Sequence, residues 1–459
     1  MKRENAWNSY GKDQLKELEA LCAHYRSFLD QSKTERECVK SAVVMAEAAG
    51  YRNLAQVIKD RQSLKAGDRV YAVSMEKTAV LFHLGTKALE KGMNILAAHI
   101  DSPRLDVKQN PLYEEGELAY LDTHYYGGIK KYQWAALPLA IHGVVVKKDG
   151  RQIPVVIGES EEEPVVGVTD LLPHLAKVQM EKKASDVIEG EKLDVLIGSR
   201  PLAGQEQEAV KACLLKLFKD SYGIEEDDFL SAELEIVPAG KAREAGLDRS
   251  MIMAYGQDDR VCAFTSLASL LNVDQVERTS CCILTDKEEI GSVGATGMES
   301  RFFENAAAEL MDRMGEYSEL KLRRCLANSR LLSSDVNAAY DPLYADAYES
   351  RNASFLGKGM VFNKFTGARG KSGSNDANAE YIARLRRILD EEHIHYQFAE
   401  LGKVDLGGGG TIAYIPARYG MEVIDCGIAV LNMHAPWEIT SKADLYETKK
   451  GYEAFLKKA

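Results

Sequence analysis

The chain has 459 residues, of which 45% are hydrophobic and 28% are charged. This composition is that of a folded protein with more than one domain, and it excludes disorder as the main state. The formal net charge is −12, from 58 Lys and Arg against 70 Asp and Glu, which argues against a dedicated nucleic-acid-binding protein.

No stretch reaches the roughly 20 consecutive apolar residues that a membrane helix needs. The first residues, Met1–Trp7, lead into a charged helical pattern rather than an apolar signal core. The eight cysteines are scattered without a Cys-x-x-Cys pair, and several lie in apolar runs such as 280–285. We therefore expect a cytoplasmic protein with no membrane partner and with buried, reduced thiols.

The first hundred or so residues alternate between helical and strand patterns. Apolar residues recur every three to four positions over 12–66, which predicts helices. Two strand-like runs follow, and then a short helix and a buried strand that stops at a histidine. In chain order these elements are Val70–Val73, Thr78–Leu84, Thr86–Lys91 and Asn94–Ala98. Such alternation predicts an α/β layered fold.

The pattern changes after Pro103. From Leu105 to Gly167 the chain shows short alternating runs broken by glycine, proline and charged pairs, which predicts a β-rich module. This module continues to about residue 235, with one helix near Gln205–Phe218, and helix–strand alternation then resumes. We therefore predict an α/β domain formed by residues 1–104 and 236–459, interrupted by an inserted β-rich domain over 105–235.

Five apolar strands of the α/β part are followed directly by carboxylates or a histidine. Ligands of open α/β sheets bind at the carboxyl ends of strands, so these side chains can converge in space. Histidine and carboxylate are the ligands that divalent zinc, cobalt or manganese accept. Each motif alone is more typical of a structural pair or a solvated acid, but the ordered set is far more specific. The motifs contain His99 and Asp101; Asp258 and Asp259; Asp286, Glu288 and Glu289; Asp335; and His434.

In these motifs the chain resembles the aspartyl-aminopeptidase family, which belongs to the dinuclear zinc exopeptidases. The resemblance covers nearly the whole chain. It implies an α/β fold in which a three-layer catalytic domain with a mixed central sheet is interrupted by a β-rich oligomerisation domain. The matching segments are His99–Pro103, Tyr126–Gly128, Asp258–Asp259, Glu288–Ser292, Ser334–Asp335, Ser372–Ser374, Gly409–Ile412, Asp425 and Met433–His434.

The resemblance also implies two divalent metal ions, zinc ahead of cobalt or manganese, with a water bridging them. It assigns Glu288 as general base and Asp101 as the residue that holds a ligand ring in place, and it implies a cis peptide between Asp258 and Asp259. Because adjacent side chains of an extended segment point in opposite directions, Glu288 and Glu289 are expected to act differently. The implied ligands are Asp258 as bridge, His99 and Asp335 for one ion, and Glu289 and His434 for the other.

The chain departs from the family at three places. The family usually has Asp-Asn where this chain has Asp258-Asp259, and a charged Asp-Arg-Asp segment where Ala135–Leu137 follows Trp134. The stretch Leu401–Asp405 also differs. Two substrate preferences therefore remain open. One is an acidic N-terminal residue, bound by a cation such as Lys364, Arg369 or Lys371, and the other is a neutral one.

The leading functional hypothesis is an aminopeptidase that acts on peptides with a free N-terminus. The alternative is a deacylase or carboxypeptidase of the same clan, acting on N-acyl amino acids or small peptides. A catalytically silent scaffold is a third option, which the complete ligand set and Glu288 disfavour. The resemblance further implies a closed homo-oligomer, with a dodecamer among the options. Apolar strands in 105–167 have edges that a neighbour would cover, and His124 is a candidate to reach a neighbour's active site.

Overall fold

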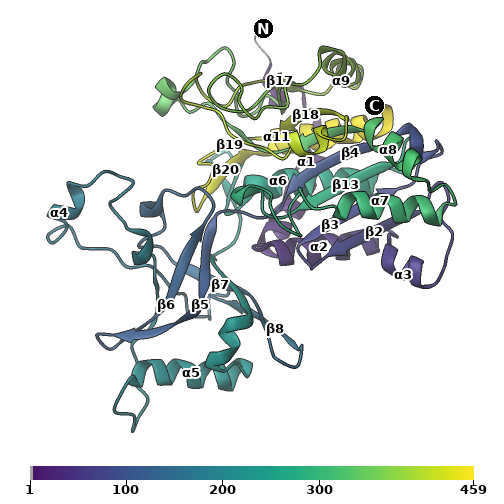
Figure 1. The fold of residues 1–459 in the computed structure, drawn as a ribbon. Coiled ribbons are helices and arrows are strands. Elements are labelled where there is room, and N and C mark those ends of the chain that lie inside the picture. The colour runs from purple at the N-terminus through teal and green to yellow at the C-terminus, as the bar shows by residue number, and fades with distance from the viewer. Residues whose placement is uncertain (1–3) are drawn as a thin grey trace. The chain divides into compact units, whose positions relative to one another are not determined.

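The computed structural model describes residues 4–459, and the chain forms two units (Figure 1). The first comprises the residues up to Asp101 together with Ala242–Met433 and Glu438–Ala459, and the second comprises Ser102–Lys241 and His434–Trp437. The sequence-based domain boundaries, at 104/105 and 235/236, lie a few residues from these divisions. Residues 1–3 of the expected N-terminal segment lie outside the described residues.

A nine-stranded mixed sheet forms the centre of the first unit. Its strand order is β1-β2-β3-β13-β4-β14-β18-β16-β17, and β13 pairs antiparallel with β3 but parallel with β4. The neighbours β13, β4, β14 and β18 are mutually parallel, so their carboxyl ends share one edge. The strands are β1 Arg52–Asn53, β2 Arg69–Ser74, β3 Thr78–His83, β4 Asn94–His99, β13 Ser280–Thr285, β14 Arg330–Ser334, β16 Met360–Asn363, β17 Tyr396–Phe398 and β18 Glu422–Gly427.

Helices cover both faces of this sheet, which confirms the predicted three-layer α/β fold. Along β4, Leu96 and Ala98 join one core cluster, whereas Ile95 and Ala97 join the other. A strand buried on both faces is apolar at every position, which explains the continuous run in the sequence. The first cluster includes α1 Lys12–Asp30, α2 Glu35–Ala48, α6 Gln257–Asn272, α9 Ala379–Glu391 and α11 Lys442–Lys458; the second includes α3 Leu54–Lys59, α7 Phe302–Arg313, α8 Glu319–Ala327 and α10 Tyr414–Ala417.

The expected helix over 86–91 is wrong, because only a single 3₁₀ turn, Leu89–Lys91, forms there. The backbone N–H groups of Thr86 and Lys87 instead donate to the carbonyls of Val276 and Glu277. A helix leaves its first N–H groups without an internal partner, so these bonds do not explain its absence. The backbone is non-helical on both sides of the turn, with a ψ of 139° at Ala88 and a φ of 92° at Gly92, and only one turn fits between them.

A second sheet of the first unit has five short strands in the order β11-β12-β20-β19-β15. Its strand β12 leads into the Asp258 segment, since β12 ends at Ala254, shortly before α6 begins. The hairpin of β19 and β20 carries His434 in its turn. The strands are β11 Arg243–Ala245, β12 Met251–Ala254, β15 Asn337–Ala338, β19 Ala429–Leu431 and β20 Glu438–Ser441.

The second unit is built on a six-stranded antiparallel sheet in the order β8-β7-β10-β5-β6-β9. Pro154 lies in the edge strand β8, where its missing N–H removes no bond inside the sheet. The predicted helix near 205–218 begins and ends four residues later, as α5 Ala209–Tyr222, and Gly223 ends it in a left-handed conformation. The other elements are β5 Arg104–Glu115, β6 Leu118–Tyr126, β7 Leu139–Val146, β8 Gln152–Ile157, α4 Lys177–Met180, β9 Val195–Gly198 and β10 Ala232–Pro238.

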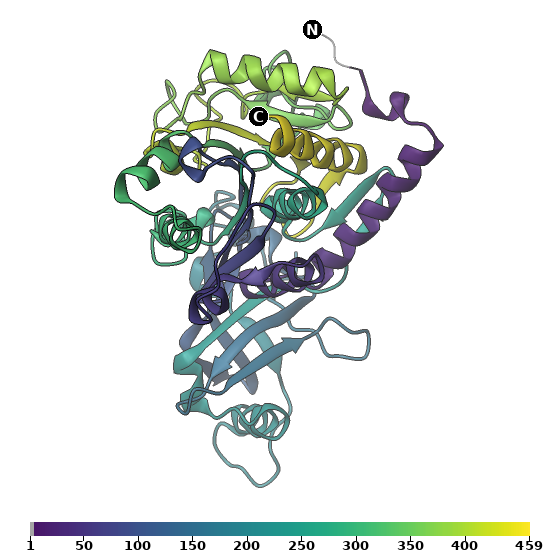
Figure 2. The same cartoon turned by 90° about the vertical axis from the view of Figure 1, so that its right-hand side faces the viewer.

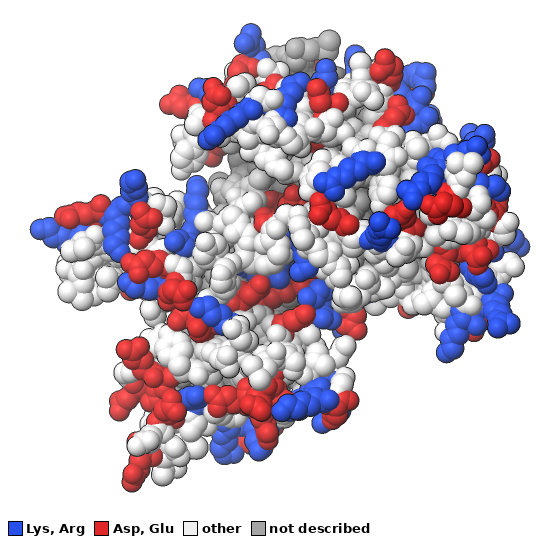
Figure 3. All heavy atoms as spheres, viewed as in Figure 1, with Lys and Arg blue, Asp and Glu red and all other residues white. Residues whose placement is uncertain are grey.

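Charged side chains are spread over the surface of both units. On the face drawn in Figure 3, acidic and basic side chains are interspersed within each unit. Among residues 4–459, no helix is both long enough and apolar enough to cross a membrane.

The helices α1 and α11 are joined by a buried lysine. Lys442 opens α11 with its side chain only 1% exposed, and its Nζ lies 2.7 Å from a carboxylate oxygen of Glu19 and 2.7 Å from one of Glu244. Glu19 belongs to α1 and Glu244 to β11, so one cation connects three elements. Figure 2 shows α1 beside the end of the chain that carries α11, and the two helices are in contact.

We predict that Lys442→Met lowers the free energy of unfolding by about 2 kcal/mol, because it leaves two carboxylates without their shared cation. The expected loss of stability is smaller than the usual cost of breaking a buried ion pair, because Glu19 is half exposed. The urea midpoint measures the change. Arg323→Met, which removes an exposed pair with Glu319, is the control and should change stability by no more than about 0.5 kcal/mol. Equal stability losses in both variants would contradict the prediction.

Candidate metal centre

The parallel strands of the central sheet bring most of the predicted polar residues to one edge. Thr285 at the end of β13 pairs with His99 at the end of β4, and Ser333 in β14 pairs with Ala97. The residues that follow these strands therefore emerge at the same level of the sheet. Asp258 reaches this edge from the start of α6, which packs on β4.

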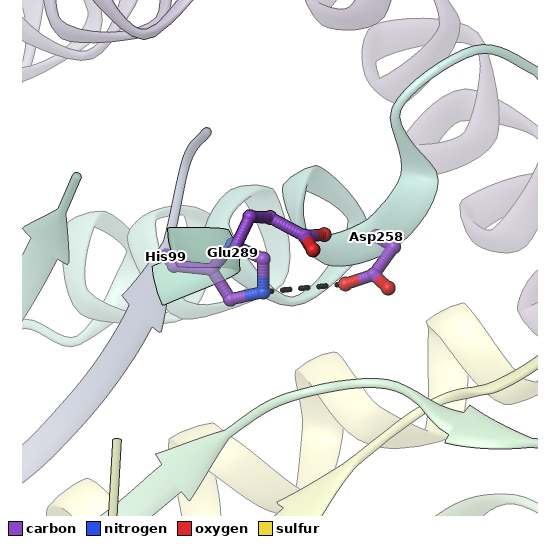
Figure 4. Close-up of side chains that lie close together, drawn as sticks. All are labelled: His99, Asp258 and Glu289. Carbon is purple, nitrogen blue, oxygen red and sulfur yellow. Dashed lines mark ion pairs between the residues drawn. The ribbon is translucent and has the colours of Figure 1, made fainter. Parts of the chain in front are cut away.

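The side chains at this edge form a tight group around His99. Its Nε2 lies 3.2 Å from Asp258 Oδ1, 3.8 Å from Asp335 Oδ1 and 4.0 Å from Glu288 Oε2. Figure 4 shows Asp258 and Glu289 directed toward the same ring. One potential ligand atom from each of His99, Asp258 and Glu289 lies within 4.8 Å of the others, and the same holds for His99, Asp259 and Asp335.

The hydrogen bonding of His99 decides which ring nitrogen faces the group. Its Nδ1 lies 3.1 Å from the backbone carbonyl oxygen of Asp101. A carbonyl can only accept, so Nδ1 carries a proton, and Nε2 is the nitrogen left to face the carboxylates. Burial lowers the pKa of His99, but hydrogen bonds that the ring donates to the carboxylates of Asp101 and then Asp258 and Asp335 raise this pKa well above its ordinary value. The surroundings thus favour positive charge at Nε2.

Asp101 positions the two glutamates. It is fully buried, and its two oxygens accept hydrogen bonds from the backbone N–H groups of Glu288, at 3.1 Å, and Glu289, at 3.2 Å. The sequence predicted that Asp101 orients a ligand ring. In the structure both its carbonyl oxygen, at 3.1 Å, and its carboxylate, at 3.4 Å, lie against Nδ1 of His99, and the carboxylate also holds this second segment. Sequence reasoning missed the second role, because these partners come 187 and 188 residues later in the chain.

Glu288 and Glu289 do not lie in an extended segment, so that expectation is wrong. Glu288–Ile290 form one 3₁₀ turn after Lys287, whose backbone is left-handed. At three residues per turn, adjacent side chains still diverge, by about 120°. The two neighbours therefore present their carboxylates in different directions, as expected, but for a different geometric reason.

Asp258 and Asp259 interrupt the start of α6. Both have non-helical backbone angles, and the peptide bond between them is cis, as predicted. The N–H of Asp258 donates to Glu438 Oε2 at 3.0 Å. Sequence reasoning did not single out Glu438, which carries no motif and lies in β20.

The carboxylates around His99 carry more negative charge than the imidazole of His99 can balance. Burial, and after it the charges of Asp335 and Asp258, raise the pKa of Glu288 to about 8. Burial and the charge of Asp335 raise the pKa of Asp259 well above its ordinary value. Both carboxylate oxygens of Asp259 are buried without a hydrogen-bond partner among residues 4–459. Buried carboxylates of this kind are stabilised by cations, so the residues present fit divalent metal ions.

His434 belongs to the second unit, where its Nδ1 lies 2.7 Å from the carbonyl oxygen of Gly128. By the argument used for His99, Nδ1 donates to this carbonyl. Gly128 lies in the segment Tyr126–Gly128 that the motif resemblance includes. The assignment of His434 as a metal ligand stays a prediction.

A family model, curated relatives and solved structures all match this chain to the same family. The model described as Aminopeptidase I zinc metalloprotease (M18) matches residues 28–456. A "Probable M18 family aminopeptidase 1" of Clostridium acetobutylicum is 60% identical over 454 residues, covering 99% of this chain and 98% of that protein. A crystal structure of an M18-family aminopeptidase from Thermotoga maritima is 46% identical, covers 100% of both chains and has a TM-score of 0.95.

A more distant structure has the same fold. It is the mApe1 dodecamer of S. cerevisiae, which is 20% identical and has a TM-score of 0.76. The match covers 94% of this chain and 95% of that one.

We predict that Asp101→Asn lowers metal affinity by about 10- to 100-fold, the usual effect of losing a group that orients a ligand. The amide has one accepting oxygen and would turn its NH₂ group toward an N–H donor, so the glutamate segment would shift. Metal content after dialysis against a weak chelator measures this. Asp286→Asn is the control. Asp286 is also buried, but it accepts hydrogen bonds from the Thr296 hydroxyl and the Lys287 N–H instead of from the glutamate segment, so this variant should keep its metal. Full metal retention by Asp101→Asn would refute the positioning role.

Proposed function

The chain belongs to the M18 family of zinc aminopeptidases, as its motifs predicted, and from this premise we propose that it releases the N-terminal residue of peptides at a centre of two divalent metal ions. Zinc is the ion we expect first, with cobalt or manganese as alternatives. The observation that carries the proposal is the convergence of His99, Asp258, Glu289 and Asp335 at one sheet edge.

The proposed division of the ligands is the one that the family resemblance implies. Asp258 is the proposed bridge, with His99 and Asp335 completing one site and Glu289 and His434 the other. The contacts of His99 Nε2 with Asp258 and Asp335 fit the first site. Two such ions supply Lewis acidity toward the scissile carbonyl and lower the pKa of a bridging water.

Glu288 is the proposed general base. Its carboxylate lies beside the group, and it is mostly buried, with a side chain 17% exposed. Burial raises its affinity for a proton, which suits a group that takes a proton from water and returns it to the leaving amine near neutral pH. A positioned base of this kind contributes about 10²- to 10⁴-fold to the rate.

Amide variants of the two adjacent glutamates should fail differently. Glu288→Gln keeps its shape but cannot accept a proton, so kcat should fall by about 10²-fold or more while both metals stay bound. Glu289→Gln removes a ligand charge, so metal content should fall and added metal should partly restore activity. Metal analysis and kcat of both purified variants are the measurements. Loss of metal in Glu288→Gln with full occupancy in Glu289→Gln would reverse the two assignments.

A substrate panel separates this function from its alternative. We expect turnover of aminoacyl-p-nitroanilides, and not of N-acyl amino acids, when the enzyme is assayed with zinc, cobalt and manganese in turn. Hydrolysis of the N-acyl compounds alone would favour the deacylase or carboxypeptidase. Within the same panel, faster turnover of leucyl than of aspartyl and glutamyl substrates would decide for a neutral preference over an acidic one.

We also propose that the second unit contacts a neighbouring copy in a homo-oligomer, which the dodecamer of the distant yeast structure makes a candidate state. The segment 165–180 supports this, since it exposes far more apolar surface than a short surface loop needs. Tyr113 and Tyr120 stack at a cavity beside it. The side chains at least 49% exposed are Val165, Leu171, Leu172, Leu175, Val178 and Met180.

The double variant Leu175→Glu with Val178→Glu should shift light-scattering mass toward smaller species, because it places charge in a contact that must lose water. Leu217→Glu on α5, a single exposed leucine outside the segment, is the matched control and should leave the mass unchanged. A fully active wild-type monomer at micromolar concentration would remove the proposal.

His124, exposed on β6, remains the candidate to reach a neighbour's active site.

A further inference from the structure

Asp259 is a buried carboxylate for which the proposed mechanism has no role. Its side chain is fully buried, directly after the bridging candidate Asp258. One of its carboxylate oxygens lies within 4.8 Å of potential ligand atoms of both His99 and Asp335.

Apart from the charge of His99, the surroundings of Asp259 offer little to balance its negative charge. Neither carboxylate oxygen has a hydrogen-bond partner among residues 4–459. Its neighbour Cys262 carries a thiol, which is only a weak donor. Arg260, the next residue, directs its guanidinium to the backbone carbonyls of Ile100 and Lys33. A fully buried carboxylate without a good donor is costly unless a cation lies beside it.

We propose that Asp259 supplies its carboxylate to the metal ion at His99 and Asp335, an inference that rests on the two-metal function proposed above. That site would then combine one imidazole with three carboxylates, those of Asp258, Asp259 and Asp335. Carboxylate-rich sites suit hard ions that accept oxygen ligands, so this site should favour manganese more than the same site in Asp259→Asn does.

The test compares metal binding by the full-length wild type and Asp259→Asn. Both proteins are stripped of metal and titrated with Co²⁺, followed by calorimetry and by the visible absorption of the bound ion. We expect two ions per wild-type chain. In Asp259→Asn we expect one of the two affinities to fall by about 10-fold or more, the scale of losing a supporting group at a metal site, with a changed spectrum for that ion. The other affinity should stay unchanged.

Two further variants secure the interpretation. Asp444→Asn is the matched control, because Asp444 is also fully buried but accepts hydrogen bonds from the N–H groups of Gly357 and Gly359. It should keep both Co²⁺ affinities. Asp259→Ala, which also removes the charge, should reproduce the loss seen with Asp259→Asn and serves if the amide variant does not fold.

The outcomes distinguish this inference from the proposed function. Two wild-type ions with unchanged affinity and spectrum in the folded Asp259 variant would overturn the role of Asp259 and leave the two-metal function standing. A wild type that binds fewer than two Co²⁺ ions would overturn the proposed function itself, and this inference with it. An equal loss in Asp444→Asn would also overturn it, since the effect would then belong to buried carboxylates in general.

Discussion

Negative charge held in a buried space is the constraint on which the first unit depends. Asp101, Asp258 and Asp259 are each no more than 3% exposed, and all lie close to one imidazole. Placing several carboxylates together in a medium of low polarity is unfavourable unless donors or cations compensate them. The structure shows both kinds of compensation. Some carboxylates around the site hold neutral donors, and others gather around His99.

The first kind of carboxylate accepts hydrogen bonds that hold the segments of the site in place. Asp101 holds two amides of the glutamate segment, and Glu438 holds the amide of Asp258. Asp425, in β18, accepts from the Thr411 hydroxyl at 2.6 Å, and burial raises its pKa to about 7. Thr411 follows the four glycines of 407–410, so this hydrogen bond attaches a glycine-rich loop to the central sheet. The donors are neutral, so positive charge is still needed where the other carboxylates meet.

How far the sequence leads depends on whether a contact is local. The strands of the central sheet and the residues that follow them could be predicted, because an uninterrupted apolar run that ends in a polar residue is a local signal. The partners of Asp101 and Asp258 could not, because they lie 187 and 180 residues away and carry no pattern of their own. The helix expected over 86–91 failed for a different reason, because the backbone angles of Ala88 and Gly92 leave room for only one helical turn between them. The charge of Asp259 was visible in the sequence, but its burial without a donor was not.

The scaffold and the metal centre are stabilised by different forces. The register of β13 and β14 on β4 is set by apolar side chains such as Ile283, Leu331 and Leu96, which are buried in two cores and carry no charge. The sheet therefore has a driving force of its own, through burial of apolar surface. The carboxylates at its edge oppose that force as long as they lack cations. Metal binding would stabilise this edge by relieving the repulsion among its carboxylates. Precise ligand placement follows from the rigidity of the strands, and metal affinity follows from the charge that they hold together.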